Sequence, residues 1–384
     1  MGACGSTASR KAKIDQANAS SKKNNESSRA SIAGKRPVAG DSYQFLNDEN
    51  QNPNEVNDMP PNNLNKTYPT FASFLLQNER AQIYEWQFLN EIGKGAMSRV
   101  FLTKNIENGE ICAAKVYNKS QLSKQNLGTN ETMFDQVNRE IDIMAKLSNP
   151  YILSLIEAIE DDVTNSLILI LPFAINGTLQ SLLEKGNSID DDGLAVCFHQ
   201  TAEALRYLHS NNIVHRDIKP DNILAFSNTY YVLSDFSVST ELESEDTLLE
   251  DTKGSPAFLS PEECSGEKFD GKRADVWAYG ITLYSAVYGR LPFNLDSGQS
   301  CSIANTVLHV TQMLEQEELE FPESRPISNE LKEVLTNVLQ KDPKKRPSFE
   351  QIVKYEWFKD AWEIDKANQQ NPEEEEDEVI ETGA

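Results

Sequence analysis

Residues 213–224, IVHRDIKPDNIL, constrain the fold of this chain more than any other stretch, because they bring Asp217, Lys219 and Asn222 within six positions beside a strand-like ILAF. Asp235 follows 18 residues after Asp217. A carboxylate can accept the proton of a hydroxyl, a lysine can neutralise a phosphate, and amide and carboxylate oxygens can ligate Mg²⁺. A stretch of this length with correctly spaced partners downstream is not a chance arrangement.

Two glycines and a lysine upstream fit the same chemistry. Gly93 and Gly95 lie in GKGAMSRV, where the absence of a Cβ lets the backbone pass close to a polyphosphate. Lys115 follows 22 residues after Gly93 in CAAKV. Each signal is weak alone, since glycines are common in hairpin turns and Lys115 alternates with apolar neighbours as an ordinary strand residue does. Their position ahead of residues 213–224 favours the phosphate-binding role.

The apolar pattern divides the chain into a strand-rich part and a larger helical part. WQFLNEI, SRVFLTKN, EICAAKVYN and SLILILPF predict strands, whereas MFDQVNREIDIMAKL has helical spacing. After residue 190, the segments LAVCFHQTAEALRYLHS, ADVWAYGITLYSAVYG and ISNELKEVLTNVLQ predict helices. FASFLLQNERAQIYEW, at 71–86, predicts a short amphipathic helix packed on the edge of the domain. No apolar run approaches the roughly 20 residues of a membrane span.

The two ends differ from the middle in composition. Residues 1–68 are rich in Ser, Asn, Lys and Ala, and residues 363–384 contain the acidic run EEEEDE, so both are predicted to be disordered. The net charge of -24 argues against a nucleic-acid partner, because a phosphate backbone repels such a surface. The five cysteines are scattered and lack CxxC spacing, which is typical of a reducing cytosol.

In their order and spacing these motifs resemble those of the protein kinase family from about residue 84 to 362. The resemblance implies an α+β, bilobal protein-kinase fold after a lead-in segment at 69–83. A small β-rich N-lobe is expected at 84–172 and a larger helical C-lobe at 173–362. It also implies ATP and Mg²⁺ as cofactors. The residues that it assigns to the nucleotide are Ile92, Gly93, Lys94, Gly95, Val100, Ala113, Lys115, Leu171, Pro172, Ala174 and Leu224.

The same resemblance assigns the chemical roles. Asp217 is expected to be the catalytic base with Lys219 beside it, and Asn222 and Asp235 the metal ligands. Lys115 is expected to pair with Glu140 of REIDIM, on the helix that follows it.

Three further residue relationships follow from the resemblance. Glu262 of SPE is expected to form an ion pair with Arg346, and Asp275 of DVWAYG to anchor the catalytic loop from below. Lys219, two residues after the catalytic aspartate, is typical of serine/threonine kinases, in which Ser255 would complete the site.

Ser237 departs from the family pattern, which has glycine after the Asp-Phe pair. A non-glycine residue at positive φ costs on the order of 1 kcal/mol, which is small against a catalytic rate enhancement. Because Lys115, Asp217 and Asp235 are all present, we expect an active enzyme rather than a nucleotide-binding pseudokinase scaffold. Ser237 is further expected to favour the metal-bound form of this turn over the flipped form.

KGSPAFLSPEE and GKRADVWAYGITLYSAVYGRLPF resemble the calcium/calmodulin-dependent protein kinase kinase group, which phosphorylates activation loops of other kinases. The resemblance implies another serine/threonine kinase as the protein substrate, with a kinase of other specificity as the alternative. Animal members of the group carry a basic calmodulin-binding helix after the domain. This chain has the acidic KDAWEIDKANQQNPEEEEDE at that place, which does not support calmodulin binding.

The activation segment carries acids where kinases often carry a phosphorylated hydroxyl. Counting back from the SPE motif places Asp251 opposite Arg216. Asp251 or Glu250 is therefore expected to pair with this arginine, so that activity needs little or no prior phosphorylation. Thr252 is the alternative, since a phosphate there would satisfy the same arginine. A merely solvated acidic loop remains a further interpretation.

The amino terminus, MGACGSTASRKAK, fits the pattern for N-myristoylation at Gly2. Cys4 could carry a second acyl chain, and a basic segment that begins at Arg10 could contact anionic lipid. The expected location is cytoplasmic and membrane-associated through this tail. The alternative is an unmodified disordered tail.

Overall fold

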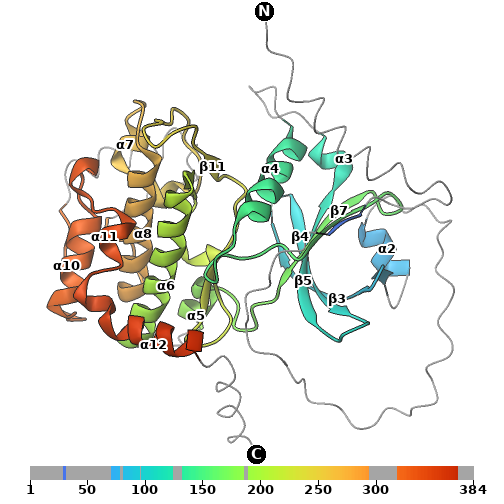
Figure 1. The fold of residues 1–384 in the computed structure, drawn as a ribbon, viewed down its shortest axis with the longest axis horizontal. Helices are drawn as coiled ribbons and strands as arrows, with labels where there is room; N and C mark the ends of the chain where they lie inside the picture. Colours follow the sequence, from blue (N-terminus) through green and yellow to red (C-terminus); the bar gives the residue numbers. More distant parts are fainter. Residues whose placement is uncertain are drawn as a thin grey trace, which may run out of the picture.

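The computed structural model describes residues 29–31, 71–77, 81–95, 97–123, 132–185, 189–293 and 318–370. Figure 1 shows two lobes side by side, a strand-rich N-lobe and a helical C-lobe. The chain crosses from one to the other after β7 (Ser166–Pro172). The α+β, bilobal architecture expected from the sequence is confirmed.

The N-lobe is built on an antiparallel sheet of seven strands among the described residues. The strand β5 alternates as its sequence predicts: Cys112, Ala114 and Val116 are buried on one face, which turns Ala113 and Lys115 to the other. In spatial order the strands are β1 (Arg29–Ser31), β6 (Glu157–Asp161), β7, β5 (Ile111–Asn118), β4 (Ser98–Asn105), β3 (Trp86–Lys94) and β2 (Gln82–Ile83).

One helix, α4 (Met133–Lys146), lies between the sheet and the C-lobe in Figure 1, after the short α3 (Lys119–Leu122). It begins at a capping box in which the side chains of Thr132 and Asp135 each accept a hydrogen bond from the other residue's backbone N–H. The apolar spacing read from the sequence buries one face of the helix. The buried residues are Val137, Glu140, Ile143 and Met144.

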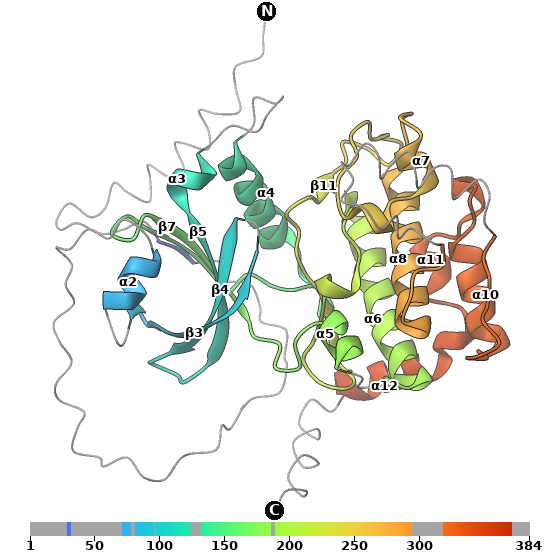
Figure 2. The same ribbon diagram turned by 180° about the vertical axis from the view of Figure 1, so that it is seen from behind.

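A second helix, α2 (Phe71–Gln77), covers the other face of the sheet, beside β3 (Figure 2). The ring of Phe71 packs 4.9 Å from that of Phe88 on β3 and 5.2 Å from that of Phe101 on β4, between ring centroids. The amphipathic helix predicted at 71–86 is therefore present but shorter, because the chain pairs as β2 after it.

The C-lobe packs around two long, largely buried helices, α6 and α8. The strands β8 (Ile213–Val214), β9 (Ile223–Ala225), β10 (Tyr231–Leu233) and β11 (Thr240–Glu241) lie on the side of the lobe that faces the N-lobe. No helix among the described residues is long and apolar enough to cross a membrane. The helices are α5 (Leu179–Glu184), α6 (Asp191–Ser210), α7 (Pro261–Cys264), α8 (Gly271–Tyr288), α10 (Asn329–Val338), α11 (Phe349–Ile352) and α12 (Lys359–Gln370).

Two elements lie across or beyond the predicted boundaries. The helix α12 continues past the domain end expected at Trp362, and its Asp365 is buried against α6, with 2.5 Å to His199 Nδ1 and 2.7 Å to Gln200 Nε2. Within the tail predicted at 1–68, β1 adds three residues to the otherwise open edge of β6, where unpaired backbone groups accept a further strand. The rest of both tails lies outside the described residues.

Candidate active site

The loop between β8 and β9 is held from below by a buried carboxylate on α8. Asp275 accepts the backbone N–H groups of His215 and Arg216, both at 2.9 Å, and lies 2.8 Å from Nε2 of His209. Burial raises the pKa of Asp275, but the His209 contact and these hydrogen bonds outweigh it, so its pKa lies below the usual value. Arg216 adopts a φ of 67°, and this anchored turn presents the next residue, Asp217, to the cleft.

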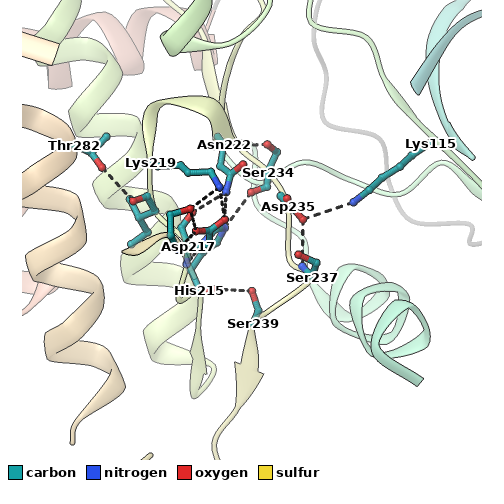
Figure 3. A network of polar contacts seen from close by, with 12 residues as sticks. Lys115, His215, Asp217, Lys219, Asn222, Ser234, Asp235, Ser237, Ser239 and Thr282 are labelled. Carbon is teal, nitrogen blue, oxygen red and sulfur yellow. Dashed lines mark hydrogen bonds and ion pairs between the residues drawn. The ribbon is translucent and has the colours of Figure 1, made fainter. Parts of the chain in front are cut away.

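Asp217 lies at the centre of a compact polar cluster (Figure 3). Lys219 Nζ lies 2.7 Å from Asp217 Oδ2, and Ser255 donates its hydroxyl to Oδ1 at 2.8 Å. Lys219 also donates to Ser255 Oγ at 2.8 Å, which gives the triangle expected from the sequence. Asn222 donates its amide to the backbone oxygen of Asp217 at 2.7 Å.

Asp235 faces this cluster from the next loop (Figure 3). Its Oδ1 lies 3.6 Å from Lys115 Nζ and accepts the backbone N–H of Ser237 at 3.3 Å. Burial raises the pKa of Asp235, but the charge of Lys115 and the Ser237 hydrogen bonds more than offset this, and the pKa lies below its ordinary value. The carboxylate is therefore ionised at neutral pH.

The expectation that Ser237 bears a positive φ is wrong for this conformation. The positive φ in this turn, 64°, belongs to Asp235, and Ser237 is absent from the residues with left-handed backbone. Asp is among the residues that tolerate this region, so the turn forms without glycine. The strain expected for Ser237 does not arise here.

Lys115 and Glu140 form the expected ion pair at 2.8 Å, with Glu140 only 3% exposed. Tyr117 donates its hydroxyl to the other oxygen of Glu140 at 3.2 Å. Burial lowers the pKa of Lys115, but the opposing effect of Glu140, Tyr117 and Asp235 is larger. The pKa therefore lies well above the usual value. The lysine is therefore cationic and joins α4 to the cleft.

The glycine-rich turn closes between β3 and β4. Gly95 donates its backbone N–H to Ser98 O at 2.9 Å, and Gly93 pairs with Val100 across the two strands. Ile92 and Lys94 flank Gly93 on β3, and the Ile92 side chain is 42% exposed. The turn is thus a narrow hairpin with the Ile92 side chain exposed beside it.

The predicted purine-binding residues come from both lobes. Ala113 lies opposite Leu171 in the register of β5 and β7, and Pro172 ends β7. Leu224 on β9 pairs with Thr178, which places it beside the segment that links the lobes. The Ala174 N–H has no hydrogen-bond acceptor among the described residues although Ala174 is 8% exposed, which fits a donor reserved for a purine edge.

The oxygens suited to Mg²⁺ come from two residues. Because Asn222 uses its amide nitrogen on Asp217, its Oδ1 is left without a donor among the described residues, as is Asp235 Oδ2. Among all the residues that the structure describes, no cluster of three or more His, Cys, Asp and Glu side chains could hold a metal. A pair of oxygen ligands completed by phosphate oxygens is how Mg²⁺ is commonly bound, so the residues fit MgATP.

The activation segment folds back over the loop that carries Asp217. The Arg216 side chain is 2% exposed, and its Nη2 lies 3.0 Å from Asp251 Oδ1. Glu250, the alternative partner, pairs with Lys268 instead. The Thr252 hydroxyl donates to the backbone oxygen of Glu263 at 3.0 Å.

Three residues of the site were missed from the sequence. Tyr117 could have been found, because it lies two residues after Lys115 on the same face of a strand. His209 gave no local signal, since it meets Asp275 from 66 positions away. Gly254 has a φ of +95°, and a Cβ there would lie 2.2 Å from the backbone oxygen of Arg216.

The pair between Glu262 and Arg346 is also present, with oxygen to nitrogen distances of 2.5 and 2.8 Å. It joins α7 to the loop before α11. Gly2 and Cys4, the predicted acylation residues, lie outside the described residues.

A two-lobed fold with a lysine–glutamate pair in one lobe and a hydroxyl-accepting aspartate in the other defines a phosphotransferase that uses a nucleotide. The family model described as "Protein kinase domain" matches residues 86–358. The chain therefore belongs to the protein kinase family, and the relatives that it matches place it among the serine/threonine kinases.

Three of these relatives indicate the breadth of the match. The calcium/calmodulin-dependent protein kinase kinase of Caenorhabditis elegans is 30% identical over 72% of this chain and 53% of its own. CBL-interacting protein kinase 11 of Oryza sativa subsp. japonica is 31% identical over 72% of this chain and 52% of its own. Serine/threonine-protein kinase GRIK2 of Arabidopsis thaliana is 30% identical over 73% and 67%. The chain spans about half the length of the first two.

Proposed function

We propose that this chain transfers the γ-phosphoryl group of MgATP to serine or threonine hydroxyls of proteins. The observation that carries the proposal is the Asp217–Lys219–Ser255 triangle, which coexists with an intact Lys115–Glu140 pair. All the charged groups that the reaction needs are in place together, whereas a scaffold that only binds nucleotide has no need of them.

Each residue has a defined task in this reaction. Asp217 accepts the proton of the substrate hydroxyl, and Lys219 offers a positive charge 2.7 Å away to the phosphoryl group that moves. Lys115 holds the α- and β-phosphates, with Glu140 fixing its position. Asn222 and Asp235 hold Mg²⁺, which, when bound, neutralises charge on the phosphates.

The first test is phosphate transfer from MgATP by the full chain, with Asp217→Asn as its matched variant. The amide keeps the size of the side chain but cannot take a proton, so we expect at least a hundredfold lower kcat with ATP binding retained. If the parent binds ATP but transfers no phosphate, the chain is a nucleotide-binding scaffold and the proposal is wrong.

The finer proposal is that the substrates are activation loops of other serine/threonine kinases. It is supported by KGSPAFLSPEE, at 253–263, and by the similarity to the nematode calcium/calmodulin-dependent protein kinase kinase. The test offers an inactive AMP-activated-type kinase as the substrate. Phosphate on its activation-loop threonine supports the upstream role. Transfer to generic proteins only leaves a serine/threonine kinase of other specificity.

The place of action that we propose is the cytoplasmic surface of a membrane. Gly2, Cys4 and the basic residues from Arg10 onward support it, because one acyl chain binds membranes weakly and a second chain or a basic segment strengthens the attachment. Labelling with a myristate analogue tests it, with Gly2→Ala as the control. A chain that takes up no label contradicts the proposal.

A further inference from the structure

The C-lobe has a polar cavity of about 470 Å³ far in sequence from the catalytic residues. Its lining residues come from α8, α10, α11 and the segments directly before and after α11, elements that lie at the end of the molecule opposite the N-lobe (Figures 1 and 2). Its size is that of a small-molecule site, but its lining is polar where such sites are mostly apolar. Its occupant should therefore be charged.

Four of the lining side chains are cationic, those of Arg273, Lys344, Lys345 and Arg346, and Arg346 is already bonded to Glu262. Lys344 and Lys345 have no acidic partner among the described residues, and both are exposed. Arg273 uses Nη1 on the backbone oxygen of Arg346 at 2.6 Å, and its Nε is 3.9 Å from Asp270. None of the described lining residues is a carboxylate. Positive charge thus gathers here on a chain with a net charge of -24, and Lys344 and Lys345 are the lining cations without an acidic partner among the described residues.

The neutral side chains of the cavity also offer donors. Tyr355 accepts the amide of Asn337 at 2.8 Å, and its own hydroxyl proton has no acceptor in the described part of the chain. Gln351 uses its Oε1 to accept the backbone N–H of Ser348 at 2.9 Å, which leaves its NH₂ group free. Each of the two side chains is therefore held by a hydrogen bond that it accepts, with its own donor available to a ligand.

We propose that this cavity is a binding site for a ligand that carries phosphate groups. Donors from four segments of the chain line it, and a phosphate group has three oxygens that accept charge-assisted hydrogen bonds from lysine and arginine. A single carboxylate offers only two oxygens and would leave several donors unused.

Two sources can supply this chemistry, a soluble inositol polyphosphate or the headgroup of a phosphoinositide in a membrane. The site is independent of the proposed catalytic reaction, because none of the donors named here contacts Asp217, Lys219 or Lys115. If the binding proposal fails, the proposed kinase activity is therefore unaffected.

The experiment measures the binding of inositol hexakisphosphate to the full chain by calorimetry, without ATP. A second arm measures sedimentation with phosphatidylcholine vesicles that carry phosphatidylinositol bisphosphate, in a Gly2→Ala background that cannot be myristoylated. The test variant replaces Lys344 and Lys345 with alanine. The control replaces Lys354 and Lys359 with alanine. These two lysines lie outside the cavity, where they pair with Glu350 at 2.7 Å and with Glu356 at 2.8 Å.

The two variants lose the same charge, so any effect of net charge alone would be equal in both. We expect the test variant to bind inositol hexakisphosphate about tenfold more weakly and the control to bind as the parent does. Tyr355→Phe should weaken binding a few-fold. Protein kinase activity serves as the check of folding.

The outcomes separate the sources. Binding of the soluble ligand alone identifies a soluble phosphate compound, and binding of the vesicles as well identifies a lipid headgroup. The proposal is wrong if the parent binds neither, or if the test variant and the control lose binding equally. It is equally wrong if a polyglutamate peptide displaces the phosphate ligand at equal concentration, because the cavity would then recognise charge alone.

Discussion

The carboxylate of Asp251 lies 3.0 Å from the buried guanidinium of Arg216, the residue directly before Asp217, the proposed catalytic base. The same guanidinium donates to Thr240 Oγ1 at 3.1 Å, so it joins two parts of the activation segment. Burial raises the pKa of Asp251, but the charges of Arg216 and Lys253 outweigh it, and the pKa lies below the ordinary value. A carboxylate that is ionised at neutral pH thus lies beside Arg216, as the sequence predicts.

The first prediction is that phosphatase treatment leaves the activity of the parent protein unchanged. Asp251→Asn should lower kcat about tenfold. Asparagine has the size of aspartate but lacks the negative charge that pairs with Arg216 and orders the segment. Glu250→Gln is the matched control, since Glu250 pairs with Lys268 and should have no effect. Loss of activity on phosphatase treatment would instead assign the role to a phosphorylated Thr252.

A second prediction concerns pH and a buried acid under the activation segment. Glu263 is 6% exposed, and burial raises its pKa from 4.5 to about 7. The folded state therefore keeps this proton over a range in which the unfolded chain releases it. The contribution of Glu263 to the free energy of unfolding is complete below pH 4.5 and falls by on the order of 3 kcal/mol as the pH rises to about 7.

Glu263→Gln tests this without losing the helix cap. Glu263 Oε2 accepts the backbone N–H and hydroxyl of Ser260 at 2.9 and 2.8 Å, and a glutamine oxygen can accept the same bonds. Denaturant unfolding of both proteins between pH 4.5 and 7 should give a difference in stability that shifts in favour of the variant with rising pH. A constant difference across this range would refute the raised pKa.

The third prediction is that Gly254→Ala abolishes most of the activity. At a φ of +95°, a Cβ would lie 2.2 Å from the backbone oxygen of Arg216, so the activation segment would have to move away from Asp217. Gly266→Ala is the control, because its φ of +77° carries a similar strain but no atom lies within 4 Å. We expect the control to lose about 1 kcal/mol of stability and little activity. Equal kcat values for the two variants would contradict the close approach.

The fourth prediction concerns Ser237. Since the φ of Ser237 is not positive here, the backbone gains nothing from glycine at this position. Ser237→Gly should therefore change kcat by less than about threefold, no more than the loss of one weak hydrogen bond would. Glycine also makes the backbone freer to adopt other conformations. An inhibitor that requires the flipped turn should therefore bind Ser237→Gly more tightly than the parent. Equal affinity would show that Ser237 does not bias the turn.

The sequence predicted those parts of the structure that depend on local pattern. SRVFLTKN is β4 over the predicted residues, and the catalytic loop follows from IVHRDIKPDNIL because its functional groups lie within a few positions. The division into a strand-rich part and a helical part follows from the change in periodicity, and the bilobal kinase fold follows from the resemblance of the motifs. These features require no knowledge of contacts between distant segments.

The sequence could not reveal features that depend on contacts between distant segments. Asp365 reads as one more acid before an acidic tail, yet it meets His199 from 166 positions away and extends the domain. Gly254 reads as an ordinary loop glycine until Arg216 is placed beside it. Ser237 was assigned a strain that the neighbouring Asp235 carries, because only the backbone conformation shows which residue turns.

The fifth prediction is that α2 supports the nucleotide site from outside the cleft. Phe71 is 6% exposed and packs on Phe88 and Phe101, which lie on the two strands that carry the glycine-rich turn. Phe71→Ala removes a buried ring from this cluster. We expect the KM for ATP to rise a few-fold with kcat and the KM for the protein substrate nearly unchanged, since only the support of the turn is lost.

Two further variants separate this effect from general destabilisation. Phe358→Ala removes an equally buried ring from the C-lobe, where Phe358 is 1% exposed, and should lower the thermal stability without changing the KM for ATP. Phe71→Leu should restore most of the parent behaviour, because it refills the apolar site. Initial-rate kinetics at varied ATP decide the matter. If Phe71→Ala and Phe358→Ala raise the KM for ATP equally, α2 stabilises the domain but does not position the turn.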